Sequence, residues 1–304
     1  MPGQGPALAF SLLLALFGIR GTDSGWPRLN YSVIPDWPHL PAGSNFGEVA
    51  AVALDASENV YVFNRSPHPL MQFSNSGQFV RSLLEGMITS AHGLRIDHQG
   101  NIWTVDFKGH TVLKLNPAGR VVMVLGRRDE AGADEAHFNR PTDVAIAPNG
   151  DLYVTDGYGN SRVVKFSKDG RFLHQWGKKG TGEGEFNLPH SIVLDGEGQV
   201  YVADRENNRI QVFTPEGRFV RQITGLGSPW GLALTHDQEI FMADGRNNRV
   251  LKLTREGKVL GALGSPGKKP GEFAYAHHLT VSPGGELYVA EILNWRVQKF
   301  LPRR

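Results

Sequence analysis

Short apolar runs separated by turn residues dominate the chain, and they recur in the same order six times. The clearest run alternates large apolar residues with other residues and ends in an acidic or amide side chain. Its copies read NVYVFNR (59–65), NIWTVDF (101–107), DLYVTDG (151–157), QVYVADR (199–205), EIFMADG (239–245) and ELYVAEI (286–292). Runs of this length bounded by Gly, Pro, Asn and Asp are typical of β-strands. The pattern therefore predicts an all-β protein built from one repeated unit.

Each copy contains further strands around this run. An apolar strand such as VALD precedes it, and a third strand such as RVVKF or RIQVF follows it. Copies one to five add a turn and a fourth strand, as in SKDGRFLHQW. Four short strands per unit and a period of roughly 40–50 residues are typical of β-propeller blades. We therefore predict a six-bladed β-propeller.

The two ends of the chain are predicted to meet. The sixth copy stops after its third strand, at Val297–Phe300, with only LPRR behind it. A missing fourth strand would leave an unpaired edge. The segment LNYSVI (29–34) lies ahead of the first blade and belongs to no copy. We expect this segment to pair with the last blade and close the ring.

The first residues have a different character. Residues 7–19 form one apolar run, ALAFSLLLALFGI, which is too short for a membrane span and has the length of a signal-peptide core. We predict a signal peptide over residues 1–24, an N-terminal segment over 25–45 and the propeller over 46–304. The expected location is outside the cell or in the secretory-pathway lumen, with no membrane attachment beyond the signal peptide.

Composition excludes several function classes. The formal net charge is only +2, so we expect no nucleic-acid partner. The chain has no cysteine, which excludes thiolate catalysis and cysteine-based metal sites. A secreted chain without disulfides depends on its core for stability. Sequons at Asn30 and Asn64 fit a secreted glycoprotein, although such triplets often occur by chance.

Histidine recurs at one register of the repeat. The position just ahead of strand one is occupied around the ring by Ala50, His92, Thr142, His190, Trp230 and His277. The innermost strand of a propeller lines the central channel, so His92, His190 and His277 should converge from alternate blades. Three imidazoles with an open fourth position suit a catalytic zinc, and copper, iron or nickel also accept imidazole. The alternative is a set of ordinary polar channel residues bonded to water.

Two arginines and a tyrosine follow strand two near the same mouth of the channel. Arg65 and Arg205 come directly after the run in blades one and four, which are opposite each other, and Tyr158 lies one position further along in blade three. Arginine binds carboxylates in a bidentate manner, which suggests an anionic or carbonyl-rich substrate. A phenol beside two guanidiniums and a metal can act as a base. The alternatives are salt bridges to blade acids and an aromatic packed between blades.

The blade motif resembles the NHL-repeat family of propellers, through DGYGNSRVVKF, DRENNRIQVF and DGRNNRVLKL. The chain from about Phe46 to Phe300 further resembles the peptidyl-α-hydroxyglycine α-amidating lyases. The resemblance is closest in AHGLRID, RPTDVAIAPNGDLYVTDGYGNSRVVKFS, QWG, LPHSIVL and VADRENNRIQVF.

That resemblance implies a zinc lyase that splits a C-terminal α-hydroxyglycine into a peptide amide and glyoxylate. It implies zinc ligands at His92, His190 and His277, a catalytic tyrosine at Tyr158 and active-site arginines at Arg65 and Arg205. The implied substrate is a small peptide or an N-acyl-α-hydroxyglycine. An upstream monooxygenase on a separate chain would supply it.

The sequence departs from this family at a second metal site. The resemblance implies a structural calcium bound by the main-chain carbonyls of Val52 and Leu94 and by an aspartate, but His278 stands at the aspartate position. Loss of the only carboxylate should weaken a calcium site severely, because Ca²⁺ needs hard oxygen ligands. The family's half-cystine pairs are replaced together, by Asn139 with Gly159 and by Tyr201 with Val212.

Two other functions compete with the lyase. One is a secreted NHL-repeat propeller that has lost catalysis and binds a partner, which the loss of the aspartate favours. The other is an RNA-binding NHL domain of an intracellular regulator. The apparent secretion signal and the small net charge count against the RNA-binding domain.

Overall fold

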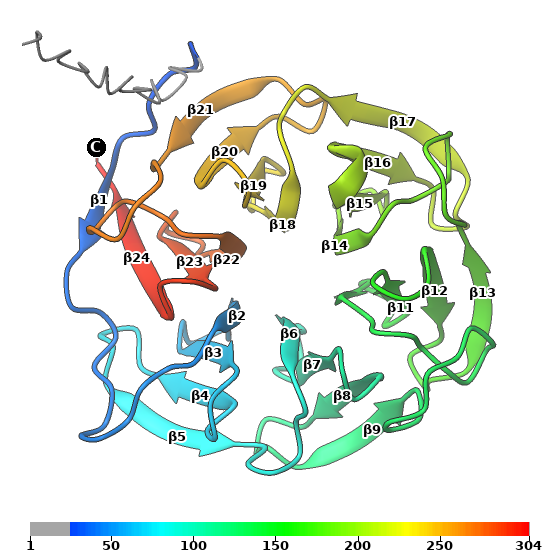
Figure 1. Ribbon diagram of the computed structural model, residues 1–304, viewed down its shortest axis with the longest axis horizontal. Helices are drawn as coiled ribbons and strands as arrows, with labels where there is room; N and C mark the ends of the chain where they lie inside the picture. The colour runs from blue at the N-terminus through cyan, green and yellow to red at the C-terminus, as the bar shows by residue number, and fades with distance from the viewer. Residues whose placement is uncertain (1–24, 304) are drawn as a thin grey trace, which may run out of the picture.

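Each repeated unit folds into one four-stranded antiparallel sheet, and the sheets surround a central channel (Figure 1). The computed structural model describes residues 25–303. The predicted signal peptide lies outside the described residues. Within them there is no α-helix, and one 3-10 turn, η1, covers Arg205–Asn207. No helix in this part of the chain is long and apolar enough to cross a membrane.

The strands follow the chain from the channel outward in every blade. Blade one contains β2 (Val49–Leu54), β3 (Val60–Asn64), β4 (Leu70–Phe73) and β5 (Phe79–Leu83). Blade two contains β6 (Ala91–Ile96), β7 (Ile102–Asp106), β8 (Thr111–Leu115) and β9 (Val121–Leu125). Blade three contains β10 (Asp143–Ile146), β11 (Leu152–Asp156), β12 (Arg162–Phe166) and β13 (Phe172–Trp176). Blade four contains β14 (Pro189–Leu194), β15 (Val200–Asp204), β16 (Arg209–Phe213) and β17 (Phe219–Thr224). Blade five contains β18 (Pro229–Leu234), β19 (Ile240–Asp244), β20 (Arg249–Leu253) and β21 (Val259–Leu263). Blade six contains β22 (Ala276–Val281), β23 (Leu287–Glu291) and β24 (Arg296–Pro302), and β1 (Tyr31–Ile34) is its fourth strand.

The ring is closed by the two ends of the chain, as predicted. Strand β1 pairs antiparallel with β24, with Tyr31 opposite Pro302 and Ile34 opposite Lys299. The last blade thereby gains the fourth strand that its own sequence lacks, and the edge of β24 is paired. The six-bladed all-β fold and its closure by an N-terminal strand are confirmed.

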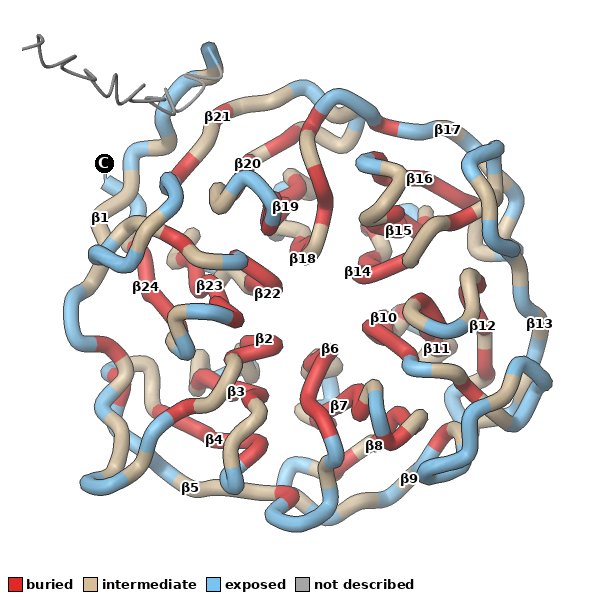
Figure 2. The backbone as a smooth tube through the Cα atoms, in the orientation of Figure 1, coloured by how far each residue is buried: buried red, intermediate tan, exposed pale blue. Residues whose placement is uncertain are grey.

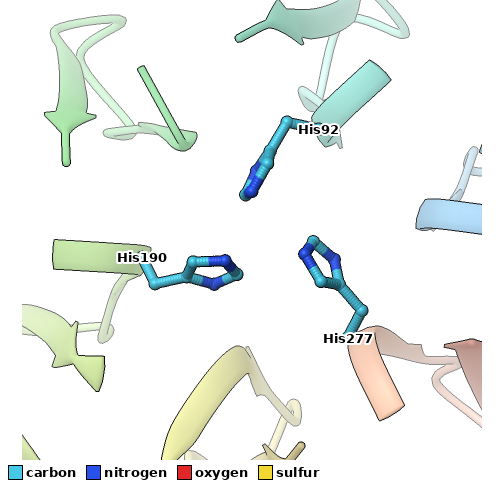
Figure 3. Close-up of side chains that lie close together, drawn as sticks. All are labelled: His92, His190 and His277. Atoms are coloured by element: carbon cyan, nitrogen blue, oxygen red, sulfur yellow. The ribbon is translucent and has the colours of Figure 1, made fainter. Parts of the chain in front are cut away.

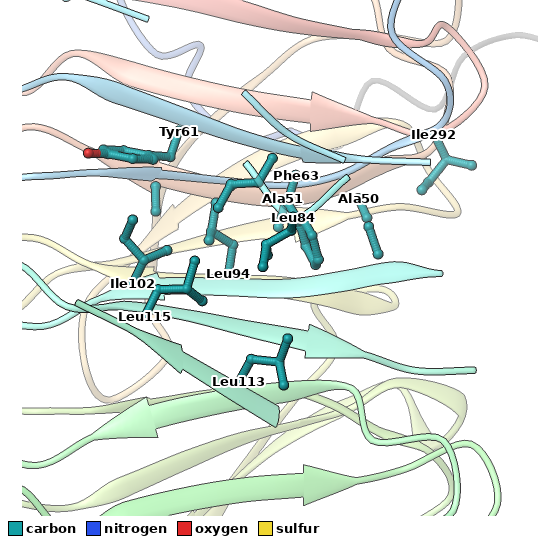
Figure 4. Close-up of a cluster of buried hydrophobic side chains, with 13 residues drawn as sticks. Ala50, Ala51, Tyr61, Phe63, Leu84, Leu94, Ile102, Leu113, Leu115 and Ile292 are labelled. Carbon is teal, nitrogen blue, oxygen red and sulfur yellow. The ribbon is translucent and has the colours of Figure 1, made fainter. Parts of the chain in front are cut away.

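The hydrophobic core is divided among the junctions between blades. Figure 4 shows the cluster between blades one and two, where Phe63 and Leu84 pack with Leu94 and Leu115. Comparable clusters fill the other junctions, so each sheet is covered by its neighbours on both faces. Burial falls from the inner strands to the outer loops (Figure 2). This packing holds the innermost strands rigidly around the channel.

The acid that ends strand two has a structural role in most blades. In blade four, Asp204 accepts a hydrogen bond from Arg209 Nε at 2.8 Å and another from the Asn187 amide at 2.7 Å. The Arg209 guanidinium then donates to the carbonyls of Gly182 and Glu185 in the preceding loop. The same acid–arginine pair recurs as Asp156 with Arg162, Asp244 with Arg249 and Glu291 with Arg296. These pairs fix the loops that carry the channel-facing residues.

The two positions of each family half-cystine pair are neighbours here as well. Tyr201 and Val212 are cross-strand partners in blade four. The Gly159 amide donates to the Asn139 carbonyl at 2.9 Å. A Cβ at Gly159 would lie within 2.1 Å of the Asn139 side chain, so the amide fills the space there. Packing and hydrogen bonding thus occupy the places of the missing disulfides.

Candidate metal centre

The three register histidines point toward one another across the channel. Figure 3 shows His92, His190 and His277 converging from β6, β14 and β22. The pairing of strands one and two shifts register at each of these residues, so each lies in a β-bulge. A bulge inserts an unpaired residue and redirects its side chain. The bulges therefore turn the imidazoles toward the channel axis.

The imidazoles form a compact and nearly equilateral group. The ring centres are 4.7 Å apart for His92 and His190, 4.8 Å for His92 and His277, and 4.9 Å for His190 and His277. One nitrogen of each ring lies within 4.8 Å of the others. The three residues are 2–3% exposed. Such a group is shielded from bulk water and close enough to share one ion.

A main-chain acceptor on the next blade orients each imidazole. The Nδ1 atoms lie 2.6 Å from the Thr142 carbonyl for His92, 2.5 Å from the Trp230 carbonyl for His190, and 2.6 Å from the Ala50 carbonyl for His277. A carbonyl oxygen only accepts, so each Nδ1 carries the proton. The Nε2 lone pairs are then available at the axis. Hydrogen bonding of the outer nitrogen is the usual second shell of a metal-binding histidine.

Burial keeps these imidazoles neutral. Desolvation lowers the pKa of His92 and His190 well below the ordinary value, and nearby positive charge lowers it further. Desolvation likewise lowers the pKa of His277 to about 3. The metal-binding form of histidine is the neutral imidazole. No proton therefore has to leave these nitrogens before a metal ion binds at neutral pH.

The group fits a tetrahedral zinc with one open position. With Zn–N bonds of about 2.0–2.1 Å, the centres of neighbouring rings would lie about 5 Å apart. The observed separations of 4.7–4.9 Å are close to that value. Within residues 25–303, no other group of three His, Cys, Asp or Glu side chains meets the same geometric test. The donor set and its spacing are compatible with zinc.

Tyr158 lies at the edge of the histidine group. Its phenolic oxygen is 3.3 Å from His92 Nε2 and 3.3 Å from His190 Nε2. Both nitrogens carry lone pairs, and the single phenolic O–H can donate to either of them. The amide of Tyr158 donates to the Arg140 carbonyl at 3.2 Å, and its ring packs 5.3 Å from Phe107. The tyrosine predicted from the repeat therefore reaches the group, rather than packing only between blades.

Arg205 contacts the same phenolic oxygen. Its Nη1 donates to Tyr158 Oη at 3.3 Å, and its Nε donates to Glu206 at 2.9 Å. The guanidinium also lies over the Trp230 ring, 4.7 Å from its centre. A salt bridge is thus present, but its acid is the next residue of the same blade and not the neighbouring blade acid considered as the alternative. It leaves Nη2 with no protein partner among the described residues.

Arg65 approaches from the opposite side of the channel. Its Nε donates to the Ala91 carbonyl at 3.1 Å, and its Nη1 pairs with Glu48. The guanidinium lies 5.2 Å from the centre of the Phe107 ring. Positive charge from both Arg65 and Arg205 contributes to the lowered pKa of His277. Both arginines therefore act electrostatically on the histidine group, and each is also paired with an acid.

Two aromatic residues complete the walls of the site and were not among the predicted site residues. Phe107 lies 5.7 Å from the His92 ring, and Trp230 lies 5.7 Å from the His190 ring. The sequence repeat could have indicated both residues. Phe107 occupies the same register of the repeat as Arg65, and Trp230 occupies the same register as the three histidines. They supply apolar surface beside the polar centre.

The residues expected at the second metal position do not fit calcium. Val52 and Leu94 are buried and lie in the innermost strands β2 and β6, where the resemblance places the two carbonyl ligands. His278 is also buried, but its two nitrogens have no hydrogen-bond partner in the described residues. A neutral imidazole is a poor ligand for Ca²⁺ compared with a carboxylate. A cavity of about 550 Å³ opens at this end of the channel and is lined mainly by apolar residues such as Leu54, Ile146 and Leu234.

Comparisons with known proteins agree with this architecture. Residues 138–166 and 186–213 match the NHL repeat. The chain is 37% identical over 225 residues to a rat protein named peptidylglycine alpha-amidating monooxygenase, covering 62% of this chain and 22% of that protein. It is 44% identical over 91 residues to a Caenorhabditis elegans protein named probable peptidyl-alpha-hydroxyglycine alpha-amidating lyase pgal-1, covering 30% of this chain and 26% of that protein. The chain thus spans about a quarter of the length of these relatives.

A solved structure shows the same fold at low sequence identity. A streptogramin B lyase superposes with a TM-score of 0.65 at 16% identity, covering 90% of this chain and 98% of that one. At this identity the likeness concerns the fold alone. The matched repeats, the ring of six sheets and the sequence relatives are consistent with one another. The chain is a six-bladed β-propeller that contains NHL repeats, and it is similar in sequence to proteins named as peptidyl-α-hydroxyglycine α-amidating lyases.

Proposed function

We propose that the protein is a zinc-dependent lyase that cleaves peptidyl-α-hydroxyglycine, or a similar N-acyl-α-hydroxyglycine, into an amide and glyoxylate. The single observation that supports this most is the position of Tyr158 Oη. It lies 3.3 Å from two Nε2 atoms and 3.3 Å from Arg205 Nη1. A proton acceptor, a cation and a buried metal-ligand set therefore meet at one point.

Zinc held by His92, His190 and His277 would supply Lewis acidity toward the substrate hydroxyl. Tyr158, as phenolate, takes the hydroxyl proton, and Arg205 stabilises the negative charge on the phenolic oxygen. As the oxygen forms the carbonyl of glyoxylate, the carbon–nitrogen bond breaks. Its electron pair goes to the amide nitrogen, which takes the proton held by Tyr158 to give the amide and restore the phenolate. Atoms and charges balance without an oxidant.

The substrate carboxylate is assigned to the arginines. The Nη2 atoms of Arg65 and Arg205 form no hydrogen bond within residues 25–303, while Nε and Nη1 of each are engaged. The engaged atoms hold each guanidinium in place, and the remaining edge can donate to an anion. Phe107 and Trp230 shield these contacts from water, which strengthens them.

Zinc content paired with glyoxylate release tests the proposal. Purified protein is analysed for metals and then incubated with α-hydroxyhippurate, an N-acyl-α-hydroxyglycine. We expect close to one zinc per chain and stoichiometric release of glyoxylate and benzamide. Dialysis against a chelator should stop release, and added zinc should restore it. A protein that contains no zinc, and gains no activity when zinc is supplied, would contradict the proposal.

A partner-binding propeller without catalysis is the second candidate. The pairing of Arg65 with Glu48 and of Arg205 with Glu206 favours it, because each acid competes with a substrate carboxylate. The same experiment separates the two functions. Bound zinc without any glyoxylate, across several N-acyl-α-hydroxyglycines, would support the binding protein.

We further propose that the protein works in the secretory pathway or outside the cell and carries a glycan at Asn30 alone. Asn30 is exposed. Asn64 is fully buried, accepts from the Gly47 amide at 3.2 Å and donates to the His68 carbonyl at 3.0 Å. A glycan at Asn64 would disrupt these bonds. Glycosidase treatment of protein secreted from eukaryotic cells should remove one glycan, and Asn30→Gln should abolish the mass shift.

A further inference from the structure

A second layer of side chains lies directly beneath the histidine group in the channel. Each blade contributes the residue that follows the histidine register, and around the ring these are Ala51, Gly93, Asp143, Ser191, Gly231 and His278. The layer has one acid, Asp143, in blade three. The position at which the related lyases are expected to carry an aspartate is His278, in the opposite blade. The acid of this layer therefore lies in the blade opposite His278.

Glycine makes room for both large polar residues of this layer. A Cβ at Gly93 would lie 3.0 Å from Asp143 Oδ1, and a Cβ at Gly231 would lie 2.9 Å from His278 Cα. The blades that precede Asp143 and His278 thus approach them more closely than a side chain would allow. The layer is closely packed around its two polar members.

The hydrogen-bonding capacity of the Asp143 carboxylate is already used. Asp143 is 1% exposed. It accepts from Arg95 Nε at 3.2 Å, from Ser191 Oγ at 2.7 Å, and from the amides of Val144 at 2.9 Å and Ile192 at 3.2 Å. Arg95 Nη2 donates to it as well. These five bonds leave no lone pair directed at an added ion.

Arg95 makes the contacts that a bound cation would make. Besides Asp143, its Nη2 contacts Ser191 Oγ at 3.2 Å and the carbonyls of Ile192 at 3.3 Å and Leu232 at 3.2 Å. Those two carbonyls occupy the same strand-one register in blades four and five as the carbonyls of Val52 and Leu94 in blades one and two. One guanidinium thereby links four of the six inner strands.

We propose that the Arg95 guanidinium, paired with Asp143, replaces a bound calcium ion as the cation that holds the inner strands together. The channel then needs no divalent ion beneath the histidines, and the histidine group is supported by the protein itself. This inference concerns the fold and holds whatever reaction the site performs. It also accounts for His278, since the guanidinium has removed the need for a carboxylate in blade six.

Calcium addition to the intact protein is the direct test. Zinc-loaded protein, freed of calcium by dialysis, is melted with and without about 5 mM CaCl₂, a concentration above the dissociation constants of extracellular calcium modules. We expect the same Tm within about 1 °C, because a ligand that does not bind the native state does not stabilise it. Mass spectrometry of metals after gel filtration should find no retained calcium. One calcium per chain, or a Tm that rises with calcium, would overturn the proposal.

Variants of the pair sharpen the test. Arg95→Met removes the charge but keeps an apolar stem, and it leaves a buried carboxylate unpaired. Its Tm should fall by roughly 5–15 °C. Arg95→Met combined with Asp143→Leu removes both charges and should recover much of that loss. An Arg95→Met variant as stable as the wild type would contradict the proposal, and the calcium measurement on the wild type decides the question even if the variant does not fold.

A gain-of-binding pair provides the matched control. Arg95→Met/His278→Asp removes the internal cation and adds a carboxylate at the family position. Calcium should raise its Tm by more than it raises the Tm of Arg95→Met/His278→Asn, which keeps only the Asp143 carboxylate. The two variants differ by one oxygen in place of one amide group. Equal calcium responses of the two variants would show that a carboxylate at position 278 does not create a calcium site when Arg95 is absent, which would contradict the proposal.

Discussion

Blades two, four and six differ from blades one, three and five at the same register, yet both sets build the histidine group. The even blades present His92, His190 and His277 to the axis. The odd blades present Ala50, Thr142 and Trp230, whose carbonyls accept the Nδ1 hydrogens. Every imidazole from an even blade is therefore oriented by the odd blade that follows it.

The difference shows which features a sequence can reveal. A metal ligand must be a particular side chain, so histidine stands out on the even blades. A main-chain carbonyl is present whatever the side chain, so alanine, threonine and tryptophan serve equally on the odd blades. The interactions that orient the three imidazoles are thus made by main-chain carbonyls, which the sequence pattern does not reveal. Four changes test this division, in order of decreasing effect.

The largest effect is expected from removing one imidazole. His190→Ala deletes a ligand from an even blade, and loss of a ligand should cost more than the roughly 10–100-fold affinity lost with a second-shell partner. Zinc affinity measured by competition with a chelating dye should fall by at least that factor, and glyoxylate release should vanish with it. His174→Ala, which removes a histidine from the outer strand β13, is the control and should keep its zinc.

Tyr158→Phe should separate catalysis from metal binding. It removes the phenolic oxygen from an odd blade while leaving all three imidazoles in place. General acid–base groups contribute roughly 10²–10⁴-fold to rate, so kcat should fall by a factor in that range. Zinc content should stay at the wild-type level. Unchanged kcat with full zinc would show that the phenol is not the base.

Acid should destabilise the metal-free protein through the buried imidazoles. Because folding lowers the pKa of His92, His190 and His277, the unfolded chain binds more protons as the pH falls below about 6.5. Their contribution is fully present above that pH and is lost progressively as the pH falls toward 3. The free energy of unfolding should drop by about 1.4 kcal/mol per pH unit for each histidine.

Urea unfolding between pH 7.5 and pH 5 measures this slope, within the interval where histidines titrate and most carboxylates remain ionised. His190→Gln should reduce the slope by one histidine's share. A free energy of unfolding that stays constant over this interval would contradict the assignment of neutral buried imidazoles.

The smallest effect is expected from an odd blade. Trp230→Phe keeps the carbonyl that orients His190 and changes only the ring beside it. Zinc affinity should therefore stay within about a factor of 10, the lower bound for loss of a second-shell partner. Substrate affinity should weaken, because the Trp230 ring lies over the Arg205 guanidinium. A collapse of zinc binding would show that the side chain, rather than the carbonyl, positions His190.

Regular repetition made most of the fold predictable. Six copies of an alternating run led to six blades, and an unused apolar segment led to the closing strand β1. The converging histidines followed from a shared register, because equivalent positions in a ring face the same axis. Arg65, Arg205 and Tyr158 followed from the same reasoning, and the structure places Arg205 against Tyr158.

The rest depended on contacts between residues far apart in the chain. Nothing in the repeat indicated that Arg95 would reach Asp143, Ile192 and Leu232 in three other blades. Salt bridges of the two arginines were foreseen only as an alternative, and with acids of a neighbouring blade rather than with Glu48 and Glu206. Long charged side chains can adopt many rotamers, and their partners are chosen by the packed surroundings.

The sequence alone determined the number of blades, the way the ring closes and which imidazoles face the axis, because these follow from local pattern and from symmetry. Tertiary structure decided the tautomer of each histidine, the contact of Tyr158 with two of them and the internal cation beneath them. Those features depend on distances of a few ångströms between neighbouring blades, and the packing of whole sheets sets such distances.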